Sequence, residues 1–345
     1  MKVKQVIVTG QHQVELQERE WEPSRDPRSL LVETEWTFIS TGTELANYTG
    51  REPQVFQPGA WCAYPWNSGY ANVGIVREVG AAVERFQPGD RVFSSGSHAS
   101  FVSPSTEALV VKVPDTIEPD IAVASRMAGV ATSAVVMAEL SLHPWVAVYG
   151  LGVVGNLAAQ AFGILGARVI GIDPVAARRE LAETCGVSVT IGDSGDAARA
   201  RIRELTDGHM ADVVIDATGL SPVINDAVKT VRMLGQLILL GSPRAAFETD
   251  MTPFLADVHL RYITVRGALE WASPTYPPTN AQRGPTRALT SLYEKQTMIF
   301  DWIREGRLHL APLISHRLPP ARIKEAYDGL LKTPEVFTGV ALDWR

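Results

Sequence analysis

Short β-branched runs separated by glycine and proline dominate the N-terminal third of the chain. The runs Val3–Val8, Leu30–Thr34 and Gly69–Val79 have the length and composition of strands. A further strand, Arg91–Phe93, follows the turn Gln87–Asp90. Many short strands with glycine and proline at the turns predict a barrel-like β domain.

From about residue 145 the pattern changes to short apolar runs that alternate with helical segments. The predicted strands are Val146–Tyr149, Arg168–Ile172, Val189–Ile191, Asp212–Asp216, Gln236–Leu240 and Tyr262–Val265. The predicted helices between them are a segment that ends at Leu165, Ala176–Thr184, Ala197–Leu205 and a segment near Pro222–Val231. This alternation predicts a doubly wound parallel sheet, and the continuous apolar runs fit strands that are covered on both faces.

The C-terminal part of the chain has a different pattern again. The proline-rich polar segment Trp271–Arg287 reads as a long loop, of the kind that often serves as a lid or binding segment. A helix near Ala288–Arg304 follows it. Apolar residues recur at helical spacing from Ile323 to Leu331, which predicts an amphipathic helix, and Val340–Leu342 is a last strand.

A glycine-rich turn joins the first strand of the predicted parallel sheet to its helix. It has the pattern G-x-G-x-x-G and consists of Gly150, Leu151, Gly152, Val153, Val154 and Gly155. In a strand–turn–helix context this pattern is the dinucleotide fingerprint. The first glycine allows the tight turn, the second lets the backbone approach a pyrophosphate at the helix N-terminus, and the third lets helix and strand pack closely.

The acidic residue of the same fingerprint is Asp173, at the end of the next strand. Its carboxylate can accept hydrogen bonds from both ribose hydroxyls and would repel a 2′-phosphate, which favours NAD(H). Arg178 and Arg179 follow closely and leave NADP possible. Thr218, after the fourth strand, and Gly241 and Ser242, after the fifth, lie at carboxyl strand ends, where such sheets bind ligands.

Length, charge and cysteine count narrow the class of protein further. The 345 residues predict about two domains. A net charge of −6 argues against a nucleic-acid partner, and we find no basic amphipathic helix for a membrane surface. Cys62 and Cys185 are too few for a four-cysteine zinc site, and the polar N-terminus is not a signal peptide. We therefore expect a cytoplasmic protein.

Four segments in this order resemble the medium-chain dehydrogenase/reductase superfamily, which includes the zinc alcohol and polyol dehydrogenases. They are Ser40–Glu44, Gly69–Gly74, Phe86–Val92 and the glycine turn. The resemblance covers nearly the whole chain. It implies an α/β plus β fold, in which a GroES-like β-barrel catalytic domain accompanies a Rossmann domain.

The same resemblance implies domain boundaries and an oligomeric state. The barrel would comprise residues 1–122 and 268–345, and the Rossmann domain residues 123–267, with the active site in the cleft between domains. Members commonly pair through the edge of the Rossmann sheet. We therefore expect a homodimer that pairs near the predicted strands Gln236–Leu240 and Tyr262–Val265, and burial of an edge strand would remove an aggregation liability.

The catalytic zinc ligands of the family are absent from the matching positions. Thr41 stands at the cysteine position and Tyr70 at the histidine position, and the stretch Met127–Gly129 offers no third ligand. Zinc needs several N, S or O ligands in tetrahedral reach, so we predict no zinc. The lone His98 is expected to be a loop or cleft residue.

Without a metal, carbonyl chemistry needs another oxyanion donor or general acid. The resemblance makes Tyr70 the candidate, because it occupies a ligand position. Thr43 matches the hydroxyl through which the family relays the substrate proton, and Glu44 is next to it. These residues predict a zinc-independent oxidoreductase that interconverts an alcohol and a ketone on a polyol, sugar or related small molecule.

Two other functions remain open. Zinc-free members of the superfamily reduce enones and quinones, usually with NADPH, but they lack an acid at the position of Asp173. The missing ligands also fit a relative that binds a dinucleotide without catalysis, or one that uses bound NAD transiently in a reaction without net redox change.

Overall fold

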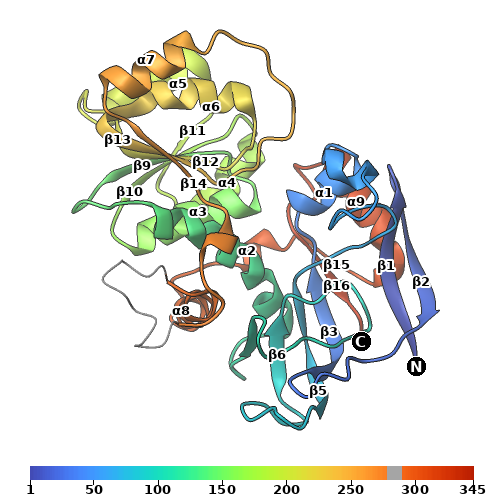
Figure 1. Cartoon of the computed structure of the whole chain (residues 1–345). Helices are drawn as coiled ribbons and strands as arrows, with labels where there is room; N and C mark the ends of the chain where they lie inside the picture. The colour runs from blue at the N-terminus through green and yellow to red at the C-terminus, as the bar shows by residue number, and fades with distance from the viewer. Residues whose placement is uncertain (278–289) are drawn as a thin grey trace. The chain divides into compact units, whose positions relative to one another are not determined.

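A computed structural model describes residues 1–277 and 290–345 of the chain and divides them into two compact units (Figure 1). Unit 1 comprises Met1–Arg126, Ser273–Glu305 and Leu313–Arg345, and unit 2 comprises Met127–Ala272 and Gly306–Pro312. The short segment Gly306–Pro312 therefore groups with unit 2, whereas the sequence assigned all of 268–345 to the first domain.

Unit 1 consists mainly of β-sheet. A three-stranded sheet has the order β2 (Gln13–Glu20), β1 (Lys2–Gly10), β4 (Trp66–Asn67). A seven-stranded sheet has the order β15 (His316–Leu318), β16 (Val340–Asp343), β3 (Leu30–Phe38), β5 (Asn72–Val79), β6 (Arg91–Ser94), β8 (Val110–Lys112), and β7 (Phe101–Val102) also pairs with β3. Because β16 lies antiparallel to β3, the C-terminal strand completes a sheet that the N-terminal segment begins.

The helices of unit 1 are α1 (Thr43–Tyr48), α8 (Leu292–Arg304), α9 (Ile323–Lys332) and the first part of α2 (Pro119–Met137). Its 3-10 turns are η1 (Pro53–Phe56) and η5 (Pro320–Arg322), while η4 (Ala311–Leu313) straddles the unit boundary. Helix α8 begins with a capping box, in which the Ser291 hydroxyl and the Glu294 carboxylate satisfy each other's backbone N–H groups.

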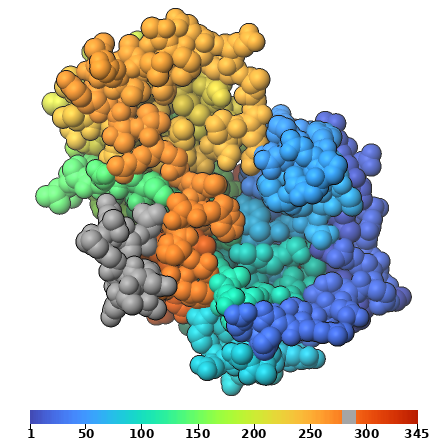
Figure 2. Space-filling model, viewed as in Figure 1, coloured from blue at the N-terminus to red at the C-terminus, as the bar shows by residue number. Residues whose placement is uncertain are grey.

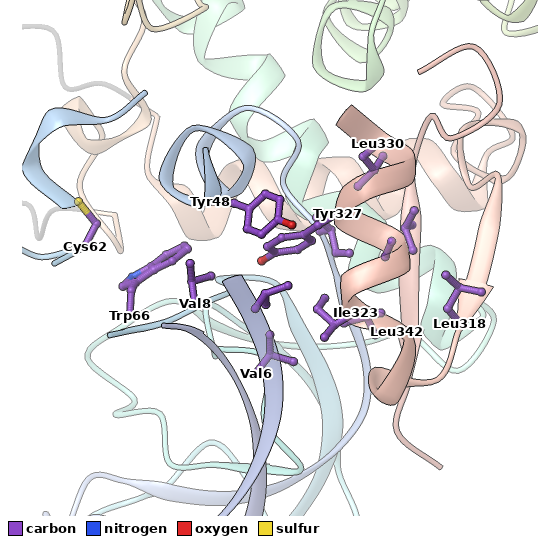
Figure 3. Close-up of a cluster of buried hydrophobic side chains, with 14 of the residues drawn as sticks. Val6, Val8, Tyr48, Cys62, Trp66, Leu318, Ile323, Tyr327, Leu330 and Leu342 are labelled. Carbon is purple, nitrogen blue, oxygen red and sulfur yellow. The ribbon is translucent and has the colours of Figure 1, made fainter. Parts of the chain in front are cut away.

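One apolar core joins the two ends of the chain within unit 1 (Figure 3). Val6 and Val8 of β1 pack in the same cluster as Tyr48 of α1 and Ile323 and Tyr327 of α9. The rings of Tyr48 and Tyr327 meet edge to face, with centroids 5.1 Å apart. The N-terminal strands and the C-terminal helix are therefore parts of one folded body.

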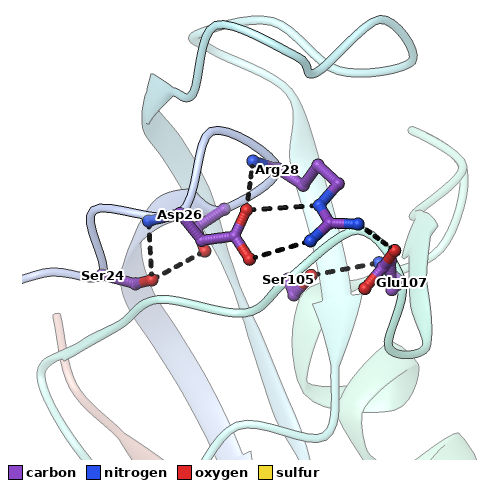
Figure 4. A network of polar contacts seen from close by, with 6 residues as sticks. Ser24, Asp26, Arg28, Ser105 and Glu107 are labelled. Carbon is purple, nitrogen blue, oxygen red and sulfur yellow. Dashed lines mark hydrogen bonds and ion pairs between the residues drawn. The ribbon is translucent and has the colours of Figure 1, made fainter.

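A polar network links two loops of unit 1 (Figure 4). Asp26 accepts hydrogen bonds from the backbone N–H of Arg28 at 2.8 Å and from its Nε at 3.3 Å. The Arg28 guanidinium also binds Glu107. These side chains are exposed, so the network orders two loops and contributes little to the free energy of unfolding.

Unit 2 is a parallel six-stranded sheet with helices on both faces. Its order is β11 (Val189–Ile191), β10 (Arg168–Ile172), β9 (Trp145–Tyr149), β12 (Ala211–Asp216), β13 (Val231–Leu239), β14 (Thr264–Gly267). The helices are α3 (Val153–Ile164), α4 (Ala176–Thr184), α5 (Gly195–Leu205), α6 (Ser221–Ala227) and α7 (Thr252–Leu260), with 3-10 turns η2 (Val228–Thr230) and η3 (Glu270–Ala272). This is the strand order of a Rossmann fold.

The side chains of neighbouring residues in a strand pack on opposite faces of the sheet. Ala147 and Tyr149 of β9 pack with side chains from α5, α6 and α7, whereas Val146 and Val148 pack with side chains from α2, α3 and α4. Both faces are therefore apolar, which explains the continuous apolar runs in the sequence.

Helix α2 is the one described helix that is long and apolar enough to cross a membrane by length and composition. About two thirds of its apolar window (67%) is buried inside the protein, as expected for a core helix. Its small side chains, mostly alanine, valine and glycine, allow close packing on all sides.

The predicted fold class, a β-rich GroES-like domain with a doubly wound Rossmann sheet, is confirmed. The long loop predicted at Trp271–Arg287 lies partly outside the described residues. The predicted helix there starts at Leu292, not at Ala288, within the described part. The sequence missed the strands β2, β4, β7, β8 and β15 and the helices α1, α2 and α7.

Candidate functional site

The glycine turn has the geometry that a dinucleotide pyrophosphate requires. Gly150 has a φ of +88°, which favours glycine. A Cβ on Gly155 would lie 1.8 Å from the carbonyl oxygen of Gly150, so only glycine allows α3 to approach β9 this closely. A Cβ on Gly152 would meet no described atom within 4 Å. Gly152 therefore opens onto free space, at the point where an anion can approach the backbone.

Gly152 is also the N-cap of α3, and no side chain of the described residues caps it there. When no side chain caps a helix, its first backbone N–H groups can donate hydrogen bonds to a ligand, and the helix dipole favours an anion there. Residues Val153 and Val154 form the first turn of α3 and carry these N–H groups.

Asp173 follows β10 and holds the glycine turn. Its Oδ2 accepts the Leu151 N–H at 2.8 Å, and its Oδ1 accepts the Val175 N–H at 2.9 Å. The residue is only 1% exposed. The Arg178 guanidinium lies 3.5 Å from Oδ2, and Arg179 donates to the Asp173 carbonyl at 2.8 Å. Two of the roughly four acceptor positions of the carboxylate are thus used within the protein.

The residues that follow β12 and β13 lie beside the glycine turn. Asp216 accepts hydrogen bonds from the N–H and hydroxyl of Thr218 and from the Gly219 N–H. Burial raises the pKa of Asp216, and these hydrogen bonds act in the opposite direction. A Cβ on Gly241 would lie 2.2 Å from the Gly219 nitrogen, and one on Gly219 would lie 2.6 Å from the Ser242 oxygen.

The Thr218 methyl in turn lies 2.8 Å from the place of a Cβ on Gly150. The structure therefore brings Thr218, Gly241 and Ser242 to the strand ends beside the glycine turn. These residues and Asp173 fit a dinucleotide, because they combine a cradle at Gly152, free helix N–H groups and an acidic residue at the end of β10.

A second polar group of side chains lies in unit 1, around Tyr70. Its phenol forms a hydrogen bond with the hydroxyl of Ser40, which is buried. The guanidinium carbon of Arg126 lies 4.9 Å from the centre of the Tyr70 ring. Burial raises the pKa of the Tyr70 phenol, whereas the Arg126 charge and the hydroxyls of Ser40 and Thr43 lower it and the Glu44 carboxylate raises it. The structure thus brings Tyr70, Thr43 and Glu44 together.

Glu44 is completely buried, and both of its carboxylate oxygens are occupied. Oε1 accepts the Ser40 N–H at 2.7 Å, and Oε2 accepts the Tyr327 hydroxyl at 2.6 Å and contacts His98 Nε2 at 2.9 Å. A carboxylate held in this way has no face left for a substrate. Glu44 therefore anchors the segment that carries Ser40 and Thr43.

His98 lies in a loop, as expected, but its side chain is fully buried. The carboxylate of Glu44 fixes one ring nitrogen, and a Cβ on Gly69 would lie 2.6 Å from its Cγ. Gly69 has a φ of +94° and immediately precedes Tyr70. The ring of His98 thus packs on the backbone that positions Tyr70.

Sequence reasoning missed three members of this group, which are Arg126, His98 and Tyr327. Arg126 left a signal, because it is the only lysine or arginine in the apolar segment that forms α2. His98 and Tyr327 left none, since they are 54 and 283 residues from Glu44 along the chain.

Zinc does not fit the residues at the family's ligand positions. Tyr70 offers a phenol that is engaged with Ser40 and lies beside a cation, and Thr41 offers a hydroxyl. Within residues 1–277 and 290–345, no group of three or more His, Cys, Asp or Glu side chains could hold a metal ion.

Comparisons with known proteins find relatives of this chain among dehydrogenases. A model of the zinc-binding dehydrogenase family matches residues 153–281. An alcohol dehydrogenase of Geobacillus stearothermophilus is 28% identical over 52% of this chain, a match that spans 62% of that relative. The 2-desacetyl-2-hydroxyethyl bacteriochlorophyllide A dehydrogenase of Cereibacter sphaeroides is 29% identical over 100% of this chain and 99% of its own length.

Solved structures show the same fold over 99% of both chains. Galactitol-1-phosphate dehydrogenase of Escherichia coli has a TM-score of 0.80 at 20% identity. An E. coli alcohol dehydrogenase complexed with NADH has a TM-score of 0.80 at 18% identity, and a Sinorhizobium meliloti dehydrogenase bound to NADP has 0.76 at 20%. By sequence the chain is similar to dehydrogenases, and its fold is that of the solved alcohol and polyol dehydrogenase structures.

Proposed function

We propose that this chain is a nicotinamide-dependent oxidoreductase that interconverts a secondary alcohol and a ketone on a polyol, sugar or related small molecule without zinc. The observation that carries the proposal is the phenol of Tyr70, held by Ser40 and faced by Arg126 at a ligand position of the zinc enzymes. Its relatives by sequence are dehydrogenases, which supports the class of reaction.

In the proposed reaction, one set of residues binds the cofactor and another transfers the proton. The glycine turn, Asp173, Thr218, Gly241 and Ser242 hold the dinucleotide, whose nicotinamide supplies or accepts the hydride when it is bound. Tyr70 gives a proton to the substrate oxygen in reduction and takes it back in oxidation. The Ser40 and Thr43 hydroxyls orient the phenol, and Glu44 fixes the segment on which both lie.

NAD(H) is the proposed cofactor because Asp173 is the acidic residue of the fingerprint, and its carboxylate at the glycine turn would repel a 2′-phosphate. One observation favours the second candidate, an enoyl or quinone reductase that uses NADPH. Arg178 lies 3.5 Å from the Asp173 carboxylate, where it partly offsets the repulsion of a 2′-phosphate. A relative that binds the dinucleotide without turnover is the third candidate.

The first experiment is a fluorescence titration of the purified protein with NADH and with NADPH, followed by a substrate panel and metal analysis. Tighter binding of NADH, with turnover of a polyol or sugar at substoichiometric zinc, supports the proposal. Tighter binding of NADPH with turnover of an enone or quinone supports the reductase. Tight binding without turnover points to a binding protein, and activity that requires stoichiometric zinc contradicts the metal-free chemistry.

We also propose a cytoplasmic homodimer that pairs through β14. Of the two strands expected at the edge of the Rossmann sheet, β14 is the last strand and β13 lies next to it. The orange surface segment of Figure 2 contains α7 and β14. Its exposed large apolar side chains include Leu255, Leu260, Tyr262, Val265 and Leu269. A monomer rarely leaves an apolar sheet edge uncovered, which supports pairing there.

A further inference from the structure

Arg126 is a buried cation in unit 1. Its side chain is 2% exposed, although arginine is almost never buried unless its charge is used. Nε donates to the Tyr70 carbonyl oxygen at 3.3 Å, and the guanidinium stands over the Tyr70 ring at 4.9 Å. The same side chain therefore contacts both the backbone and the aromatic face of Tyr70.

The backbone next to Arg126 is held firmly. The hydroxyl of the preceding residue, Ser125, donates to the Ala122 carbonyl at 2.5 Å and accepts a hydrogen bond from Gln296 Nε2 of α8 at 2.7 Å. All of these groups are buried. These hydrogen bonds fix the turn of α2 that carries Arg126, and a charge on a fixed element is what electrostatic preorganisation requires.

The charge of Arg126 acts on the phenol through the ring. A cation over an aromatic face is attracted by the ring electrons, and a phenolate is richer in electrons than a phenol. The polar and charged groups that face Tyr70 are Arg126, Ser40, Thr43 and Glu44. Of these, only Arg126 is positively charged, and it opposes the effects of burial and of Glu44.

We infer that Arg126 is a positioning residue whose guanidinium, through the face of the Tyr70 ring, provides the positive charge that proton exchange by this phenol requires. The inference rests on the proposed function, in which Tyr70 exchanges the substrate proton. In reduction the phenol O–H bond breaks, its proton goes to the substrate oxygen as the nicotinamide hydride goes to the carbon, and the phenolate charge remains beside Arg126. Oxidation is the reverse, and the phenolate regains the proton.

This role depends on the charge of Arg126, which separates it from a purely structural role. Arg126→Met removes the charge and keeps much of the apolar stem, whereas Arg126→Lys keeps a charge on a different head group. Arg85 provides a matched control, because its guanidinium stands over the half-buried ring of Tyr276 at 4.6 Å. Arg85→Met removes an arginine–tyrosine contact without touching Tyr70.

The test needs no substrate. All eight tyrosines are replaced by 3-fluorotyrosine, which lowers the phenol pKa into a range that the fold tolerates, and each is followed by fluorine NMR from neutral to alkaline pH. Tyr70→Phe identifies the resonance of Tyr70. We expect Arg126→Met to move the Tyr70 midpoint upward by about 1 to 3 pH units. Arg126→Lys should recover at least half of that shift, and Arg85→Met should leave the midpoint where it is.

A midpoint that is the same in Arg126→Met and the unsubstituted protein overturns the inference, as does an equal shift in Arg126→Lys and Arg126→Met. Far-UV circular dichroism establishes that each variant is folded, and Arg126→Gln replaces the Met variant if that protein does not fold. The proposed function fails separately, if Tyr70→Phe retains full turnover on an identified substrate. In that case the fluorine titration still decides whether Arg126 controls the phenol.

Discussion

At the scale of single residues, Tyr70 stands where the resemblance to the zinc dehydrogenases predicts a metal ligand. Hydroxyls and a buried cation face its phenol, and these surroundings suit the acid–base role proposed for it. The sequence analysis also proposed Glu44 as a catalytic residue. In the structure both carboxylate oxygens of Glu44 accept hydrogen bonds from other residues of the protein. Adjacent candidates can therefore differ in role even though they share one site.

Tyr70→Phe should lower kcat by about 10²- to 10⁴-fold, the usual contribution of a general acid. The substitution removes one hydroxyl and keeps the ring that Arg126 faces, so the affinity for NADH should not change. Steady-state kinetics and the NADH titration measure the two quantities. Undiminished kcat would remove Tyr70 from the mechanism.

Glu44→Gln should lower the free energy of unfolding by about 1–3 kcal/mol. The amide replaces one acceptor oxygen by a donor, which then faces the Ser40 N–H or the donors of Tyr327 and His98 in a fully buried place. Urea unfolding measures the change. Glu33→Gln is the control, since the exposed pair of Glu33 with Arg77 contributes at most about 1 kcal/mol.

The lowered pKa of Asp328 predicts that the stability of the protein depends on pH. Burial acts to raise its pKa, but hydrogen bonds from Lys324, Tyr48 and Lys332 outweigh burial and lower the pKa from 3.8 to about 2. The folded state therefore binds this proton less readily than the unfolded chain, and the stabilisation is present above about pH 4 and lost as the pH falls towards 2.

The matching variant is Asp328→Asn. At pH 6 we expect it to be less stable than the unsubstituted protein by about 1 kcal/mol, after allowing for solvent screening of this partly exposed carboxylate. The difference should shrink between pH 4 and pH 2. A difference that stays constant over that interval would show that the Asp328 carboxylate is not the group responsible.

At the scale of elements, the Rossmann unit followed from its sequence. The strand Arg168–Ile172, the helix Ala176–Thr184 and the strand Val189–Ile191 have the predicted bounds. Helix α2 was missed because it is apolar on every side and shows no polar stripe, and α7 because no residue of it is buried. Strand β2 is mostly polar and was missed for that reason.

The dinucleotide part of the candidate site could be predicted from the sequence more fully than the group around Tyr70. The dinucleotide residues lie within one turn and at the ends of neighbouring strands, so local spacing finds them. The Tyr70 group comes from α1, α2, α9 and the loop around His98, and no pattern along the chain links these segments. Only the resemblance to a family pointed to Tyr70, and it could not reveal the buried partners.

Two glycines of the same turn should respond differently to alanine. Gly155→Ala places a Cβ 1.8 Å from the Gly150 oxygen and should lower the free energy of unfolding by about 1–3 kcal/mol. Gly152→Ala meets no described atom within 4 Å, and its φ of −61° suits alanine, so stability should change by less than about 0.5 kcal/mol.

Gly152→Ala should instead weaken NADH binding by about tenfold or more, because the methyl group occupies the space where the pyrophosphate approaches the backbone. Thermal unfolding and fluorescence titration of both variants provide the comparison. Equal affinity of Gly152→Ala and the unsubstituted protein would place the pyrophosphate elsewhere.

At the scale of the whole molecule, the exposed edge strand predicts the oligomeric state. Light scattering should give twice the mass of one chain, and Val265→Lys should shift the protein towards the monomer, because lysine on an edge strand opposes pairing. Leu142→Lys is the control, since Leu142 is 96% exposed in a loop. A monomeric unsubstituted protein at micromolar concentration would contradict the proposed dimer.

The contact between Tyr327 and Glu44 has a consequence for the order in which the protein is made. Ribosomes release the N-terminal residues first, yet the hydroxyl that hydrogen-bonds to Glu44 belongs to Tyr327, and the strand that completes the β3 sheet is β16. The Tyr70 group therefore stays incomplete until Tyr327 and β16 have been synthesised, whereas the strands of the Rossmann unit, which is almost continuous in the chain, are all made earlier. Cofactor binding on nascent chains should thus precede proton-transfer competence.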